Sequence, residues 1–101
     1  MVLNNPRKSP MSIKTGSYTG DAGDDRQITT GFKCSLVVLI NADYTVCAIL
    51  IPGISYAVKT TPILLAGGTA LHATDGFTVY HTTDLMNAGT KAYYYWAIAT
   101  A

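Results

Sequence analysis

Short apolar runs separated by turn residues set the pattern of this chain. Ser35 to Ile40 is almost entirely apolar and has the length of one strand, so we expect a strand that is buried on both faces. Asn41-Ala42-Asp43 is a turn signal, and Tyr44 to Ile51 is apolar again. The two runs and the turn between them predict a central β-hairpin.

Alternation is clearest from Lys91 to Ala101. One face of this strand would carry Ala92, Tyr94, Trp96 and Ile98, and the other Tyr93, Tyr95, Ala97 and Ala99. Large rings point to both sides, so neither is a plain solvent face. Aromatic residues with one polar tip suit a core edge or a subunit interface and also suit stacking on a sugar, and packing is the commoner use. Tyr93, Tyr95 and Trp96 are therefore candidate interface residues.

The stretch from Lys14 to Phe32 predicts two strands and a tight loop. Gly20 to Asp25 contains only Gly, Asp and Ala, a composition typical of turns because Gly accepts positive φ and Asp bonds its own backbone. Lys14 to Thr19 and Arg26 to Thr30 flank it with β-forming residues. We expect the loop to hold these two strands in register with each other.

Further short strands are predicted along the rest of the chain. They cover Ile54–Lys59, Ile63–Ala66, Thr69–His72 and Phe77–His81, with Gly, Pro or Asp turns between them. All six acidic residues are Asp, which favours turns, whereas Glu favours helices. Seven to nine short strands predict an all-β fold, a single-domain antiparallel β-sandwich or jelly roll over residues 13–101.

Residues 1–12 are expected to form an extended N-terminal arm. Pro6 and Pro10 bracket Arg7-Lys8-Ser9, and the residue before a proline favours extended backbone. The arm is either a frayed chain end or a strap that orders against a neighbouring subunit. On the second interpretation, Arg7 and Lys8 are candidate interface residues.

Composition adds an expectation about assembly. The chain has 101 residues, of which 13% are charged and 49% hydrophobic, with a net charge of +1. This is little charge for a small soluble monomer, so surplus apolar surface is expected to meet another subunit. The low net charge and the lack of a basic stripe predict no nucleic-acid partner. Met1 to Pro10 lacks the apolar region of a signal peptide, and no apolar run is long enough for a membrane span.

The two cysteines are not expected to pair. If the hairpin joins residues whose numbers sum to about 83 or 84, Cys34 opposes position 49 or 50 and Cys47 opposes 36 or 37. In the even register they also point to opposite faces. Two buried thiols, or a disulfide to a neighbouring subunit, remain as interpretations.

Candidate chemistry is sparse. His72 and His81 each precede an Asp by three positions, at Asp75 and Asp84, but this spacing is not diagnostic of a metal site. The loop acids Asp21, Asp24 and Asp25 lack the alternating ligands and terminal Glu of a calcium loop. There is no phosphate-binding loop or nucleophile elbow. We therefore predict no catalytic residue, no cofactor and no metal, and a protein that is not an enzyme.

Several segments resemble small β-domains in structural proteins of tailed-phage virions. The likeness at the start of the domain lies in Gly16-Ser17-Tyr18-Thr19-Gly20-Asp21, Arg26, Ile28 and Gly31-Phe32-Lys33 ahead of Leu36-Val37-Val38. The likeness at its end lies in Asp75-Gly76-Phe77-Thr78-Val79 and Asn87-Ala88-Gly89-Thr90-Lys91-Ala92-Tyr93. It spans most of Lys14 to Ala101 and consists of turn and core signatures. The resemblance therefore concerns fold and virion context.

The resemblance implies a virion protein that is assembled in the host cytoplasm. It implies first a capsid decoration or cement subunit, a homo-oligomer with trimeric symmetry that binds capsid or other virion proteins. The alternative is a receptor-binding or glycan-binding tip of a tail fibre, which would use exposed aromatic rings.

Overall fold

The computed structural model describes residues 12–41, 47–58, 62–65, 67–81, 84 and 86–99. In this part of the chain the predicted all-β fold is confirmed, with nine strands and no helix. The strands are β1 (Ile13–Thr19), β2 (Arg26–Ile28), β3 (Cys34–Asn41), β4 (Cys47–Ile51), β5 (Ile54–Val58), β6 (Pro62–Leu64), β7 (Ala70–Leu71), β8 (Phe77–Val79) and β9 (Ala92–Ala99). The predicted arm, with Arg7 and Lys8, lies outside the described residues except for Ser12.

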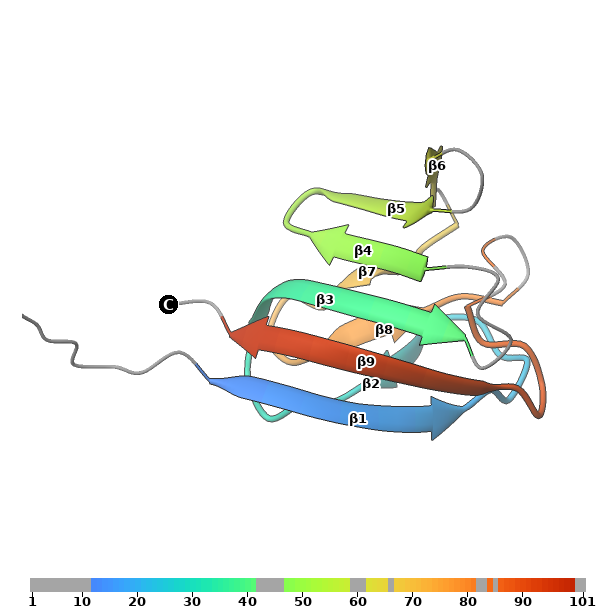
Figure 1. The fold of residues 1–101 in the computed structure, drawn as a ribbon, viewed down its shortest axis with the longest axis horizontal. Helices are drawn as coiled ribbons and strands as arrows, with labels where there is room; N and C mark the ends of the chain where they lie inside the picture. Colours follow the sequence, from blue (N-terminus) through green and yellow to red (C-terminus); the bar gives the residue numbers. More distant parts are fainter. Residues whose placement is uncertain are drawn as a thin grey trace, which may run out of the picture.

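Two antiparallel sheets of unequal width form a sandwich (Figure 1). The large sheet has six strands in the order β1-β9-β3-β4-β5-β6, and the small sheet has three in the order β2-β8-β7. The run from β3 to β6 is a meander, because each strand pairs with the next one in sequence. The last strand, β9, lies between β1 and β3 and joins the first strand to the meander.

One predicted pairing is wrong: β1 and β2 are not neighbours. β1 pairs with β9 at the edge of the large sheet, and β2 pairs with β8 in the small sheet. The Gly/Asp loop therefore crosses from one sheet to the other. The long-range partner wins because β9 offers β1 seven paired residues, from Ile13–Ile98 to Thr19–Ala92, whereas β2 is only three residues long.

The central hairpin is confirmed, but its register differs from the predicted one. Ile40 pairs with Cys47 and Val37 with Leu50, a shift of three to four positions. β3 extends to Asn41, the first residue of the predicted turn, and β4 is described from Cys47. The start of the predicted return strand, residues 44–46, lies outside the described residues.

The two cysteines are free and face opposite sides of the large sheet. Cys34 is buried between the sheets at 2% exposure, whereas Cys47 lies on the outer side opposite Ile40. The register between β3 and β9 shifts between Cys34 and Leu36, which is a β-bulge. The bulge turns Cys34 inward. Without it, Cys34 and Leu36 would point to the same face, because side chains two positions apart in a strand share a face.

Aromatic rings from three strands make the centre of the core. Tyr18 of β1 stacks on Tyr93 of β9, with ring centroids 4.9 Å apart, and Phe77 of the small sheet meets the Tyr95 ring edge-on at 5.2 Å. The Tyr18 hydroxyl donates to the Met86 carbonyl at 2.7 Å, so its polar tip is satisfied. Burial raises the pKa of Tyr18 and of Tyr95 above the ordinary tyrosine value. The core therefore holds both sheets together through paired rings.

Candidate interaction surface

The side of the large sheet that faces away from the small sheet is apolar over five of its strands. In each strand the alternate residues that point outward can be followed from the pairing register. We call these residues the outer face: Ile13, Leu36, Val38, Ile40, Cys47, Ile49, Ile51, Ile54, Tyr56, Leu64, Tyr94, Trp96 and Ile98. Thr15 and Ser17 add two hydroxyls at the β1 edge.

The outer face is exposed and carries no charge among the described residues. Trp96 is 50% exposed and Tyr94 46%. Val38 of β3 pairs with Trp96 of β9 on one side and with Ile49 of β4 on the other. The apolar residues are thus contiguous across the sheet. Exposed apolar patches of this continuity mark sites of protein–protein contact, and large aromatic residues are the ones that anchor such contacts.

The candidate interface residues predicted from the sequence in β9 lie on different faces of the large sheet. Trp96 belongs to the outer face. Tyr93 and Tyr95 do not, because they point between the sheets and are only 1% and 7% exposed. Tyr93 and Tyr95 are therefore core residues, and their prediction as interface residues is wrong. The predicted alternation of β9 is right, but the face with Tyr93 and Tyr95 is the core face. Arg7 and Lys8 lie outside the described residues.

Sequence reasoning did not select most of the outer face by residue. Tyr94, Ile49 and Tyr56 are exposed large hydrophobic residues. The residues directly before and after each of them in the strand point inward and are buried. The available signal was that strands of a two-layer sandwich need only one apolar face, whereas β3, β4 and β9 have two. Ser35 to Ile40 was expected to be buried on both faces, and its outward residues Leu36 and Val38 are half-buried.

A buried asparagine organises the loop between β1 and β2. The Asn87 side chain is fully buried and donates to the Asp21 carboxylate and to the Gly23 carbonyl. Its oxygen accepts from Arg26 Nη1 at 3.1 Å. The bonds from Gly23 N–H and Asn87 hold the pKa of the exposed Asp21 carboxyl below its ordinary value. These groups satisfy one another, so Asp21 has a structural role here.

The two His-x-x-Asp segments also stabilise turns. Asp75 accepts from the backbone N–H groups of Thr30 and Gly31, and these bonds, that of Thr30 first, lower the pKa of its carboxyl. Asp84 accepts from Gly67 and Thr69 N–H groups. His72 Nδ1 accepts from the Thr74 N–H at 3.2 Å. Within the described ranges no three His, Cys, Asp or Glu side chains gather as metal ligands would.

The described residues contain no helix with the length and apolar character to cross a membrane. Comparisons of the chain with protein-family models, with curated proteins and with solved structures found no match.

Proposed function

We propose that this chain is a structural protein of a phage virion, a capsid decoration or cement subunit that stabilises the particle surface. In this proposal it works as a homotrimer in the virion and uses the outer face to pack against protein. The virion context rests on the turn and core signatures described above. The observation that carries the packing role is the continuous, uncharged and exposed outer face.

The energetics of the outer face favour a covered state. Apolar burial contributes roughly 25 cal/mol per Å², so covering a few hundred Å² per chain supplies several kcal/mol before the costs of association. Trp96, Tyr94 and Tyr56, all at least 40% exposed, are of the residue types enriched at the centre of interfaces. A face without charge also packs against another protein surface without like-charge repulsion.

The test has two stages. Light scattering at micromolar concentration is expected to give a mass near three chains, and a Trp96→Asp variant is expected to give one. The protein is then added to undecorated capsids of the phage that encodes it, with bound copies counted by mass. A monomeric wild-type chain that leaves such capsids unlabelled would contradict the proposal.

Exposed rings favour a second candidate, a glycan-binding tip of a tail fibre. Tyr94 and Trp96 project from adjacent outward positions of β9, and sugars stack on such rings. Their neighbours on β3, Val38 and Ile40, are aliphatic, whereas those on β1, Thr15 and Ser17, carry hydroxyls. Hydrogen-bonding groups therefore flank the rings on one side only. Binding of the purified chain to an array of bacterial surface glycans, lost in Trp96→Ala, would favour this candidate over packing.

A further inference from the structure

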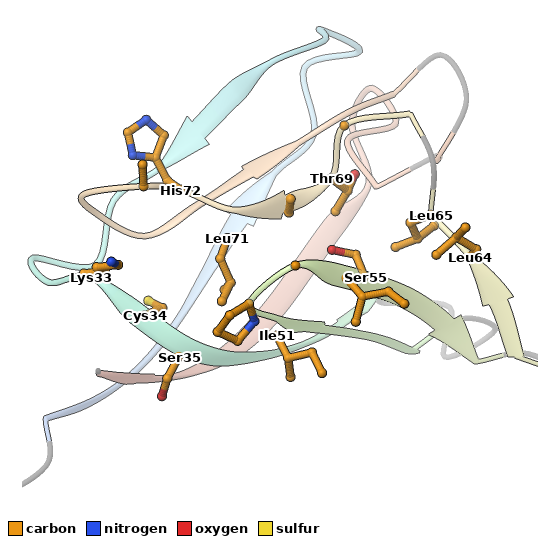
Figure 2. A pocket seen from close by; sticks show the side chains of 16 residues that line it. Lys33, Cys34, Ser35, Ile51, Ser55, Leu64, Leu65, Thr69, Leu71 and His72 are labelled. Atoms are coloured by element: carbon orange, nitrogen blue, oxygen red, sulfur yellow. The ribbon is translucent and has the colours of Figure 1, made fainter. Parts of the chain in front are cut away.

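The unequal sheets leave a cleft beside β7. β7 is the edge strand of the small sheet and packs against β3 and β4 of the large sheet. The small sheet therefore does not extend over β5 and β6. A cleft of about 640 Å³ lies there, lined by the β4–β5 turn, the start of β3 and residues 68–73 (Figure 2). A strand residue occupies roughly 160 Å³ of a two-sheet sandwich, from a rise of about 3.3 Å, a strand spacing of about 4.8 Å and a sheet separation of about 10 Å. The cleft therefore has room for about four residues of an extended chain.

The edge of β7 that faces the cleft has main-chain groups available for pairing. His72 N–H donates to the Gly76 carbonyl, and in an antiparallel ladder the paired groups alternate along the strand. Leu71, opposite Phe77, consequently turns its N–H and C=O away from β8. Within the described residues β7 pairs only with β8. An added strand could form two main-chain bonds with Leu71, as in β-augmentation.

A buried hydroxyl on the opposite wall lacks a hydrogen-bond partner. Ser55 of β5 is 3% exposed, and its Oγ has no partner in the described structure. In Figure 2 this hydroxyl points across the cleft toward Thr69. A buried hydroxyl without a bond costs free energy that a suitable ligand can recover. The two polar sites on facing walls suit a ligand with repeated polar groups along its length, which describes a polypeptide backbone.

Charge at the cleft selects among possible strands. Lys33 and His72 lie on its lining, and none of the described lining residues is acidic. The remaining wall includes Leu71, Leu65 and Pro52. An apolar strand with an acidic side chain fits this wall better than the arm of the chain itself, because the arm carries Arg7 and Lys8 and has no acidic residue.

We propose that the cleft binds an extended segment of another protein, which adds as a strand to β7. The segment has apolar residues at alternate positions and an acidic residue near Lys33. Its backbone bonds Leu71 and Ser55, and its apolar side chains pack on the wall that includes Leu71, Leu65 and Pro52. The cleft shares Ile51, Ile54 and Leu64 with the border of the outer face. The groups that define the cleft, Leu71 and Ser55, are not part of the outer face, so the inference does not depend on the proposed virion role.

Two synthetic peptides test the proposal with the full chain. Each has five alternating valines and threonines; one has a glutamate at each end and the other a lysine at each end. Affinity is measured by calorimetry, and the peptide site by hydrogen exchange of the Leu71 amide. The glutamate peptide is expected to bind and to protect that amide. The lysine peptide is expected to bind at least about threefold more weakly, the scale of an exposed ion pair.

Variants then assign the binding to the cleft. Lys33→Glu is expected to reverse the preference between the peptides, whereas Lys14→Glu, the same charge change on exposed β1, should preserve it. Ser55→Ala is expected to lower the affinity for the glutamate peptide about fivefold, which corresponds to the loss of one hydrogen bond.

Three outcomes overturn the proposal. The first is no binding of either peptide at millimolar concentration, and the second is binding without protection of Leu71. The third is tighter binding of a peptide with the sequence of residues 1–11, which would assign the cleft to the arm of this chain.

Discussion

Tyr95 and Trp96 are consecutive in β9, yet they lie on opposite faces of the large sheet and differ in exposure, 7% against 50%. The Tyr95 ring packs edge-on against Phe77 of the small sheet, while Trp96 lies beside Val38 on the outer face. The same substitution at these two positions should therefore separate folding from assembly.

A charge at Trp96 should prevent assembly and leave the fold intact. Trp96→Asp places a carboxylate at an exposed position, where substitutions typically change stability by less than about 0.5 kcal/mol. In an interface, the same carboxylate would be buried without a partner. We expect a folded monomer, measured by light scattering together with circular dichroism.

Tyr95→Asp is the matched control. It removes a buried ring and buries a charge, which should cost about 4 kcal/mol or more, and much of the β signal should be lost. If Trp96→Asp unfolds the chain as fully as Tyr95→Asp, the outer face is needed for folding and is not free for a partner.

The two thiols should differ in reactivity and report on the outer face. Cys34 is buried between the sheets, whereas Cys47 is partly exposed on the outer face. Iodoacetamide should modify Cys47 in the native chain and Cys34 only after unfolding, as followed by mass spectrometry. Assembly should slow modification of Cys47, and Trp96→Asp should restore it. Equal rates in the assembled and monomeric forms would place the subunit contact elsewhere.

Replacement of the unpaired hydroxyl should stabilise the free chain. Ser55→Ala removes a buried polar atom without a hydrogen bond, a group whose burial costs about 1–3 kcal/mol. We expect a gain of about 1 kcal/mol in chemical denaturation. Ala57→Ser, on the same face of β5 and also buried, should lose a similar amount. A loss of stability in Ser55→Ala would show that the hydroxyl has a partner in solution.

The buried asparagine should be among the most sensitive polar positions. Asn87→Ala leaves the part-buried Gly23 carbonyl without the bond that Asn87 now provides, whereas Arg26 Nη1 keeps its bond to the Thr19 carbonyl. A buried group left unpaired costs about 1–3 kcal/mol, so the variant should lose about 1–3 kcal/mol in urea unfolding. Thr29→Ala, at an exposed position, serves as the control and should stay near the wild type.

Local pattern predicted the strands better than their partners. The alternation in β9 correctly separated Tyr94 and Trp96 from Tyr93 and Tyr95, because side chains in a strand alternate by geometry. It could not say which set was inside, since both sets carry large rings. The two small residues beside Tyr95 on its face, Ala97 and Ala99, are both buried and pair with β3.

Features that depend on distant segments were beyond local pattern. β1 pairs with β9 from the other end of the chain, so the expectation that it would pair with β2 failed. The bulge between Cys34 and Leu36 reverses which side Cys34 faces, and no residue type at this position predicts a bulge. The cleft exists only because the sheets differ in width, a property of the whole topology.

Acid should destabilise the chain partly through Asp75. Its carboxylate accepts from the N–H groups of Thr30 and Gly31, and its folded pKa is therefore lower than the ordinary Asp value of about 3.9. Between the folded and unfolded pKa values the unfolded chain binds more protons, so this contribution is present above about pH 4–5 and is lost as the pH falls through the folded pKa.

Asp75→Asn removes that titration while keeping an oxygen that can accept a hydrogen bond. We expect the variant to be less stable than the wild type at pH 7 and to approach it at pH 2–3. The difference in free energy of unfolding between pH 7 and pH 3 should be smaller in the variant, as measured by urea titration at each pH. Asp21, whose pKa is also lowered, keeps the same sign of dependence in both proteins, so some acid sensitivity should persist. An unchanged difference would mean that the bonds to Thr30 and Gly31 do not distinguish the charged from the neutral carboxyl.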